Sequence, residues 1–317
     1  MIDFFSNLYA SIRGRNSFLI KTKIYSIGRI VTRLSCNVIL PIYLKVTSNN
    51  IQYKLQETNK TKGRIIVSLT SFNKRIGRVW IAIESILRQT CQPDMIILWL
   101  SKEEFPAIEC LPKTLLRLQQ RGVKIELRDG NLMSHKKYYY TLVEYPDDHM
   151  ITIDDDIIYP SNFITSLLNG HRQYLECVIS RFAFNIKRDG NNVILPYHMW
   201  SGKLLDRATS PSFDIFFGSG GGTFFPAHIL GEEAKNITLA MEKCKFADDV
   251  WLNTMCRLNK KKIIVINNLF SYLPILNFSN SKLVAINNGQ NQNDVQISNL
   301  REYYIRHFKT DPYSLLN

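Results

Sequence analysis

Three consecutive carboxylates, Asp154, Asp155 and Asp156, directly follow an apolar segment at residues 150–153. Like charges a few ångströms apart raise one another's pKa, so such a run is costly unless a cation neutralises it. Mg²⁺ and Mn²⁺ prefer hard oxygen ligands and are commonly held by one or two carboxylates together with phosphate oxygens. The run therefore predicts a divalent metal site, with an acidic turn or a helix cap as the alternative.

A second acidic pair, Asp248 and Asp249, stands at the start of a helix predicted for residues 248–257. The positive end of a helix dipole stabilises carboxylates there, so a capping role is one interpretation. The other is catalytic, because an ionised carboxylate near a metal and a phosphate is well placed to take a proton from an acceptor hydroxyl.

Four further features could contribute to a site. The glycine-rich residues 218–222 allow a close backbone approach, but they match neither a P-loop nor a dinucleotide fingerprint. Residues 197–200 form either an aromatic platform for a ligand or, as we favour, an ordinary packed cluster. The amide-rich residues 287–294 suggest a mobile lid or a plain surface loop. His307 is a conceivable third metal ligand, although a lone histidine is weak evidence.

The elements that must position these residues alternate along the chain. Apolar, β-branched runs predict strands, and helical spacing of apolar residues predicts the helices between them. This order implies an α/β fold with a parallel sheet and right-handed crossovers, whose ligands bind beyond the carboxyl ends of the strands. The predicted strands are 64–70, 95–100, 123–127, 150–153, 178–184 and 262–266, and the predicted helices are 79–88, 112–122, 227–240 and 248–257.

Residues 63–270 resemble a nucleotide-sugar-dependent glycosyltransferase of the GT-A fold, close to glycosyltransferase family 2 and similar bacterial surface-polysaccharide enzymes. The resemblance rests on four motifs in order: VSLTSFN at 67–73, DDD at 154–156, GSGGG at 218–222 and DDVWL at 248–252. It implies a Rossmann-like, mostly parallel central sheet.

The resemblance also implies roles for single residues. The loop after the first strand would contact the nucleotide of the donor through Thr70, Ser71 and Asn73, and Arg75 and Arg78 would reach its diphosphate.

The acidic residues take the remaining roles in this resemblance. Asp154 or Asp155 would bind the ribose, and Asp156, with Asp154, would hold Mn²⁺ or Mg²⁺ at the diphosphate. Asp249 would be the general base of an inverting transfer, and Asp248 would orient the acceptor or support the loop.

Two positions near the donor are less settled. Lys137 would present its ammonium group to the diphosphate beside a stacked tyrosine, or it would lie at the exposed start of a helix whose tyrosines pack inward. Family members commonly carry an acid at the end of the second strand to hold the nucleobase or ribose, whereas this chain has Ser101 there.

The net charge of +13 is concentrated near the N-terminus. Residues 1–64 contain eleven basic and two acidic side chains, so they carry +9 and the other 253 residues only +4. A basic groove for nucleic acid across the main body is therefore excluded, since phosphate contacts need the charge on the binding face.

The same N-terminal residues have a basic amphipathic pattern. They predict either an in-plane helix on an anionic cytoplasmic leaflet or a helical arm packed on the body. The longest apolar run, residues 36–44, is too short to span a bilayer. The six cysteines show no metal-site or disulfide pattern, which indicates reduced thiols in a cytosolic protein.

These observations predict three regions: a basic amphipathic arm and linker at residues 1–62, a GT-A domain at 63–270 and a lid or tail at 271–317. The expected function is metal-dependent, inverting transfer of a sugar from a nucleotide donor to a glycan, lipid-linked, in bacterial surface polysaccharide synthesis. The expected location is the inner face of the cytoplasmic membrane. The alternatives are a metal-dependent nucleotidyl or phosphoryl transferase, and a non-catalytic scaffold in polysaccharide assembly.

Overall fold

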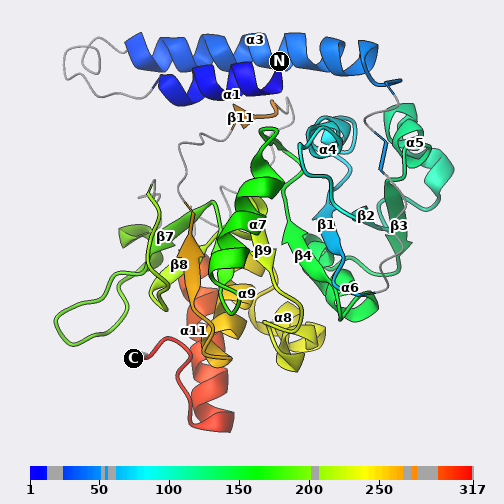
Figure 1. Cartoon of the computed structure of the whole chain (residues 1–317). Helices are drawn as coiled ribbons and strands as arrows, with labels where there is room; N and C mark the ends of the chain where they lie inside the picture. The colour runs from blue at the N-terminus through cyan, green and yellow to red at the C-terminus, as the bar shows by residue number, and fades with distance from the viewer. Residues whose placement is uncertain are drawn as a thin grey trace.

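A seven-stranded sheet in the order β10-β6-β9-β4-β1-β2-β3 forms the centre of the molecule (Figure 1). The computed structural model describes residues 1–12, 24–50, 54–55, 62–200, 207–266, 273–276 and 292–315. Adjacent strands are parallel except at β9, which runs antiparallel to β4 and β6. The strands of the sheet are β1 (Ile65–Thr70), β2 (Met95–Ser101), β3 (Lys124–Arg128), β4 (His149–Thr152), β6 (Val178–Ser180), β9 (Thr223–Phe225) and β10 (Ile263–Val265).

Helices cover both faces of this sheet, which explains why its central strands are apolar on both sides. In β2, Ile96 and Leu98 pack in one core with α4 (Val79–Leu87) and α7 (Phe163–Gln173). The alternate residues Ile97 and Trp99 face the opposite side, toward α6 (Lys136–Glu144). Because successive strand residues point to opposite faces, a strand covered twice needs apolar side chains throughout.

The expected α/β class with a Rossmann-like, mostly parallel sheet is confirmed. Two expectations about single elements are wrong. The strand predicted at 178–184 divides into β6 and β7 (Ala183–Asn185), and β7 pairs with β8 (Ile215–Phe217) in a separate two-stranded sheet. The helix predicted at 227–240 is a 3₁₀ turn, Glu232–Lys235, followed by α8 (Ile237–Lys243), which Asn236 caps through its side chain.

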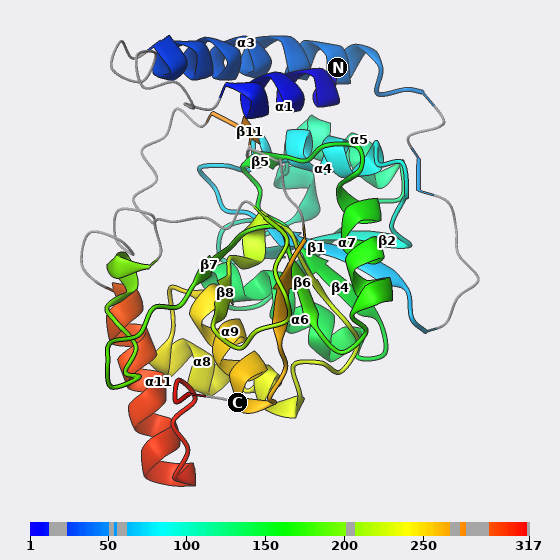
Figure 2. The ribbon, with the colours of Figure 1, turned by 60° about the vertical axis from the view of Figure 1, so that its left-hand side comes forward.

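Two N-terminal helices, α1 (Ile2–Ser11) and α3 (Ile24–Val46), lie side by side next to β5 (Ile157–Ile158) and β11 (Leu273–Pro274) (Figure 2). Cys36, Leu40 and Leu44 of α3 are fully buried in the core that contains α4. The N-terminal helices therefore pack on the body through one face. Of the apolar positions expected there, Phe18 and Leu19 lie outside the described residues.

By length and composition, Tyr25–Val46 is one helix of the described chain that could cross a membrane. This corrects the sequence-based estimate, which considered only residues 36–44, a run broken by Asn37 and Pro41. Neither residue ends the helix, so the apolar segment is longer than that run indicates.

The C-terminal helix α11 (Gln292–Phe308) packs on α8 and α9 (Asp248–Leu258). Its buried residues Ile297, Leu300 and Tyr304 belong to the same core as α9. Of the amide-rich segment, residues 287–291 lie outside the described chain, and Asp294 accepts a hydrogen bond from the Tyr197 N–H at 2.7 Å.

Asn37 joins α3 to β11. Its side-chain amide donates to the Pro274 carbonyl at 2.9 Å, and its side-chain oxygen accepts the Leu276 N–H at 2.7 Å. We predict that Asn37→Ala lowers the free energy of unfolding by about 2 kcal/mol, because partly buried backbone groups of Pro274 and Leu276 lose their partner.

Chemical denaturation of Asn37→Ala and of an exposed control, Asn191→Ala, tests this. Equal midpoints for the two variants would mean that the contact between α3 and β11 contributes nothing to stability.

Candidate active site

The acidic run lies where β1 and β4 end side by side. These strands are parallel neighbours, so the residues that follow each of them emerge at the same edge of the sheet. The Ser71 hydroxyl donates to Asp155 at 2.6 Å. Arg75 reaches Asp155 and Asp156 at 2.8 Å each. Arg75, from the loop after β1, therefore supplies positive charge to the acidic run at this edge.

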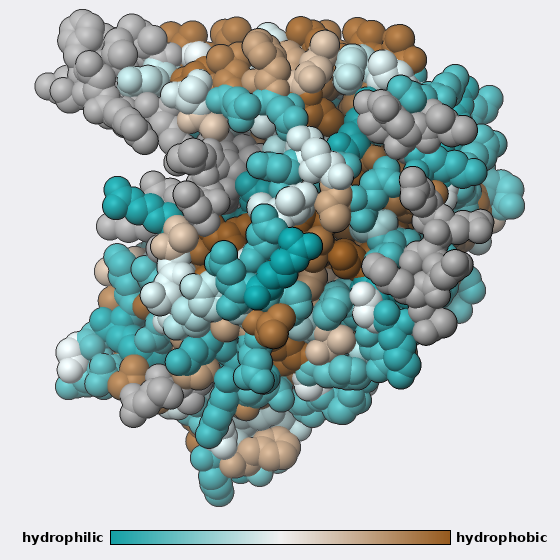
Figure 3. Space-filling model, in the orientation of Figure 1, coloured by the Kyte–Doolittle hydropathy of each residue, from teal (hydrophilic) through white to brown (hydrophobic). Residues whose placement is uncertain are grey.

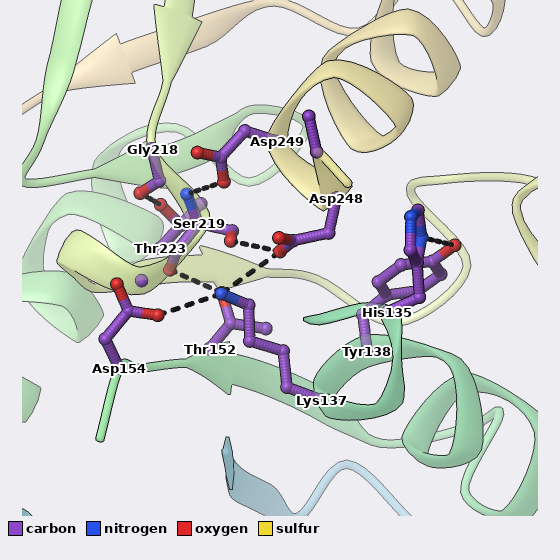
Figure 4. A network of polar contacts seen from close by, with 12 residues as sticks. His135, Lys137, Tyr138, Thr152, Asp154, Gly218, Ser219, Thr223, Asp248 and Asp249 are labelled. Carbon is purple, nitrogen blue, oxygen red and sulfur yellow. Dashed lines mark hydrogen bonds and ion pairs between the residues drawn. The ribbon is translucent and has the colours of Figure 1, made fainter. Parts of the chain in front are cut away.

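Lys137 connects the two acidic clusters. Its side chain is 5% exposed, and its ammonium nitrogen lies 2.9 Å from Asp154 and 3.1 Å from Asp248 (Figure 4). The helix that carries it, α6, packs under β1 and β4. Of the two interpretations of this segment, the exposed lysine is wrong, while Tyr138 does pack inward in full burial.

The glycine-rich segment holds the second acidic pair in place. The Ser219 hydroxyl donates to Asp248 at 2.5 Å, and the Ser219 N–H donates to Asp249 at 2.6 Å. On the other side, the Gly220 carbonyl accepts from the Asp154 N–H at 3.1 Å and from the Tyr159 hydroxyl at 2.6 Å. One short segment therefore positions carboxylates from both clusters.

Burial and charge separate the proton affinities of Asp248 and Asp249. Burial and the neighbouring Asp248 raise the pKa of Asp249 to about 7. Burial would also raise the pKa of Asp248, but the Lys137 charge, together with His135 and the hydrogen bond from Ser219, outweighs it and lowers that pKa below its ordinary value. Two carboxylates whose pKa values are pushed apart can serve as proton acceptor and as fixed charge.

The acidic run shows a similar contrast. Burial and the Asp154 charge raise the pKa of Asp156 to about 7 despite Arg75. Burial also raises the pKa of Asp155, although Arg75 and Ser71 oppose this. In both cases burial is the largest cause, and it outweighs the opposing effect of Arg75.

A cavity of about 200 Å³ opens beside these side chains. It brings together six residues that the sequence singled out for donor binding, and it adds the buried Lys136 and the carboxylate of Glu104. The six are Thr70, Ser71, Arg75, Lys137, Asp154 and Asp155.

Other predicted residues lie elsewhere. Asn73 is exposed and does not line the cavity, although its N–H lies 3.4 Å from Glu104. Arg78 donates to the Asn37 carbonyl in α3, away from the donor cavity. His307 stacks on Tyr303 of its own helix at 4.7 Å. Trp200 is buried against Tyr197 and Phe216, which agrees with the packed cluster.

Sequence reasoning missed Ser219, Tyr159, Lys136 and Glu104. Ser219 lies within the glycine-rich residues 218–222, a composition that gives no sign of a side chain with a bonding role. Ser101, and not an acid, ends β2. Glu104 follows three residues later, in the turn after the strand, and its carboxylate lines the cavity. A search of the first turn after each strand, and not only of its last residue, would have found it.

The fit of a metal ion depends on Asp154 and Asp156. No group of three His, Cys, Asp or Glu side chains arranged for a metal occurs among the residues that the structure covers. Mg²⁺ commonly needs only one or two protein carboxylates beside phosphate oxygens. Asp154 and Asp156 keep 41% and 30% of their side chains exposed, and the charge of Asp154 is one cause of the raised pKa of Asp156, after burial. These two carboxylates therefore fit such an ion.

No protein-family model and no curated protein matches this sequence. Among solved structures, a mannosyltransferase from Pyrobaculum calidifontis in complex with GDP-Man and Mn²⁺ is similar at 11% identity and TM-score 0.47, over 96% of this chain and 78% of that one. A 4-diphosphocytidyl-2C-methyl-D-erythritol synthase from Anaerococcus prevotii is similar at 15% identity and TM-score 0.44, over 73% and 99%.

A CMP:2-keto-3-deoxy-manno-octonic acid synthetase complexed with CTP is similar at 9% identity and TM-score 0.39, over 73% of this chain and 99% of that one. Likenesses this distant do not decide the reaction, which has to be inferred from the side chains.

Gly220 leaves no room for a side chain. A Cβ there would lie 1.8 Å from the carboxylate of Asp154. We predict that Gly220→Ala lowers the free energy of unfolding by about 1–3 kcal/mol, because the loop and Asp154 must move apart.

The matched control is Gly190→Ala, where a Cβ meets nothing within 4 Å; we expect a change within about 0.5 kcal/mol there. Indistinguishable thermal unfolding of the two variants would contradict the close packing of Gly220 on Asp154.

Proposed function

We propose that the protein is a metal-dependent glycosyltransferase that moves a sugar from a nucleoside-diphosphate donor to a hydroxyl of a glycan acceptor. The observation that carries the proposal is the pairing of Lys137, which lines the cavity, with one carboxylate from each acidic cluster, Asp154 and Asp248. Inverting transfer needs one proton acceptor and one site for the leaving diphosphate, and the two clusters supply these separately.

The donor would lie in the cavity with its diphosphate near three cationic side chains, Arg75, Lys136 and Lys137. Thr70 and Ser71 would contact the nucleotide, and Asp155, held by Ser71 and Arg75, would accept from the ribose. Fixed positive charge aimed at the leaving phosphate stabilises the charge that develops there, without reorganisation during the reaction. The buried ion pairs keep these cations in position before the donor arrives.

Mg²⁺ or Mn²⁺, held by Asp156 and Asp154 together with phosphate oxygens, would supply further positive charge beside the leaving group. Asp249 would take the proton of the incoming hydroxyl, since a pKa near 7 is matched to a general base at neutral pH. Asp248, kept ionised by Lys137, would hold the ammonium group and orient the acceptor.

The acceptor would be a lipid-linked glycan of a bacterial surface polysaccharide, and the enzyme would act on the cytoplasmic face of the membrane. The basic amphipathic N-terminus supports this part of the proposal. Residues 1–62, 63–270 and 271–317 would then serve as membrane arm, catalytic domain and C-terminal tail.

Asp249→Asn should keep donor affinity and lose transfer by about 100- to 10,000-fold, the usual contribution of a general base. In the unmodified protein kcat/KM should rise as the pH increases through about 7, because Asp249 accepts a proton only when ionised. The rise should vanish from the residual activity of Asp249→Asn.

Near-normal turnover by that variant would place the base elsewhere. Asp129→Asn, at a carboxylate whose side chain is 86% exposed, is the control and should behave as the unmodified protein.

Asp156→Ala should weaken nucleotide-sugar binding in Mn²⁺ by at least about tenfold, equivalent to about 1.4 kcal/mol. A ligand that binds only the native state raises its stability by mass action, so thermal shift with a panel of nucleotide sugars measures this. With EDTA in place of Mn²⁺, the variant and the unmodified protein should bind equally weakly. Unaltered affinity of the variant in Mn²⁺ would remove Asp156 from the metal site.

A further inference from the structure

The outer face of α3 is an apolar stripe open to solvent. Ile27, Val31, Leu34, Val38 and Ile42 recur at helical spacing, and each side chain is more than half exposed, Val38 at 64%. Figure 3 shows these brown atoms gathered along α3 at the top edge of the molecule. Residues three and four apart share a helix face, so this is one continuous surface, and contiguous patches of this kind mark interaction sites.

The opposite face of the same helix is core. Thr32, Cys36, Leu40 and Leu44 follow one another at intervals of four, and each is buried. The helix is therefore covered on one side by the body and uncovered on the other. On the neighbouring helix α1, Phe4 and Leu8 are exposed as well, at 63% and 38%.

The charge of this region suits an anionic surface. Residues 4–56 contain eight basic side chains and no Asp or Glu, and four of the eight belong to the described residues. At the C-terminal end of α3, a hollow of about 560 Å³ is lined by Lys45, Lys54, Arg117 and Arg121, with Glu84 as its acidic member. An apolar helix face in a basic segment is typical of helices that lie in the headgroup region of anionic lipid.

Hydrogen bonds fix the orientation of α3. Asn37 bonds to Pro274 and Leu276, and Arg78 and Arg88 donate to the carbonyls of Asn37 and Leu44 at 3.3 Å. A spanning orientation would break these contacts and strip the buried face from its core, although the helix is long enough to cross. If α3 keeps these contacts, its exposed face can meet a bilayer only with the helix parallel to the bilayer surface.

The N-terminal helices α1 and α3 are also linked to the segment that carries the acidic run. β11, which Asn37 binds, pairs with β5 directly after the aspartates, and the Ile275 N–H donates to the Asp156 carbonyl at 2.7 Å. From α1, Asp3 accepts from the Ser161 N–H at 2.8 Å and from its hydroxyl at 2.6 Å. A surface that docks through α3 therefore lies next to the segment that carries the candidate metal ligands.

We infer that the apolar face of α3 docks in the plane of a bilayer that contains anionic lipid, and that it holds the donor site at this surface so that a lipid-borne acceptor can reach it. The inference deepens the proposed function and rests on it for the acceptor. It names α3 as the docking element, the bilayer as the occupant of its face and the in-plane orientation.

Vesicle flotation of the full chain tests docking. The unmodified protein should float with phosphatidylcholine vesicles that contain phosphatidylglycerol, less with phosphatidylcholine alone, and less at high salt because exposed charges are screened. Val38→Glu should lower the partition coefficient at least tenfold. Val295→Glu, on α11 at a position 47% exposed, is the matched control and should float normally.

Equal flotation of Val38→Glu and the control would overturn the inference. So would a dimer in solution that Val38→Glu dissociates, because a second copy would then be the occupant. Donor binding by thermal shift, read on the same variants, keeps the two proposals apart. Flotation without donor binding contradicts sugar transfer and leaves membrane docking in place. Donor binding without flotation contradicts membrane docking, including the proposed membrane arm, and leaves sugar transfer in place.

Depth of insertion tests the orientation. Ile27 and Leu34 lie about 10 Å apart along the helix axis, and Leu34 is close to the middle of the segment Tyr25–Val46. Ile27→Trp and Leu34→Trp, each compared with the unmodified protein, should be quenched to the same shallow depth by lipids brominated at known positions. Quenching of the Leu34 variant near the bilayer centre, with the Ile27 variant remaining shallow, would show a spanning helix and overturn the in-plane orientation.

Discussion

The candidate site depends on one buried cation. The ammonium group of Lys137 lies between Asp154, which follows β4, and Asp248, which begins α9. Burying carboxylates without a counter-charge is costly, and removing one partner from such a pair leaves an uncompensated charge inside the protein. Lys137 therefore lets two acidic segments that are distant in the sequence approach one another, and α6 must lie under β1 and β4 to bring the ammonium group between them.

The division of labour among the carboxylates follows from this arrangement. Asp248 is bonded to both Lys137 and Ser219, and it stays ionised although it is buried. Asp249 is the next residue along, and burial together with the negative charge of Asp248 raises its pKa to about 7. Adjacent residues in one helical turn are thus suited to different tasks, one to fix a charge and the other to exchange a proton.

The sequence was most informative where structure follows from local pattern. β1 and β2 are strands of six and seven mostly apolar residues, covered on both faces, so the sheet was predictable. The aspartate run directly follows a strand, so the edge of the sheet that carries the site was predictable too. β9 was not, because it has three residues and is held by antiparallel pairing to β4 and β6 rather than by any period of its own. The role of Ser219 was equally hidden, since it depends on how a glycine-rich turn lies against α9.

The N-terminal region shows the same limit of sequence reasoning. The spacing of its apolar and basic residues left a packed arm and a membrane helix equally open. In the structure α3 has a buried row at Cys36, Leu40 and Leu44 and an exposed row at Leu34, Val38 and Ile42. Both rows are apolar, so the sequence alone does not show which of them packs on the body and which is exposed.

The most direct measurement identifies the products. The purified protein is incubated with Mn²⁺, a nucleotide sugar that stabilises it and a glycan acceptor, and the phosphate-containing products are resolved. Acceptor-dependent release of a nucleoside diphosphate, with no pyrophosphate formed, is the result that glycosyl transfer predicts. Formation of pyrophosphate from a nucleoside triphosphate and a sugar phosphate would contradict it and establish nucleotidyl transfer at these carboxylates instead.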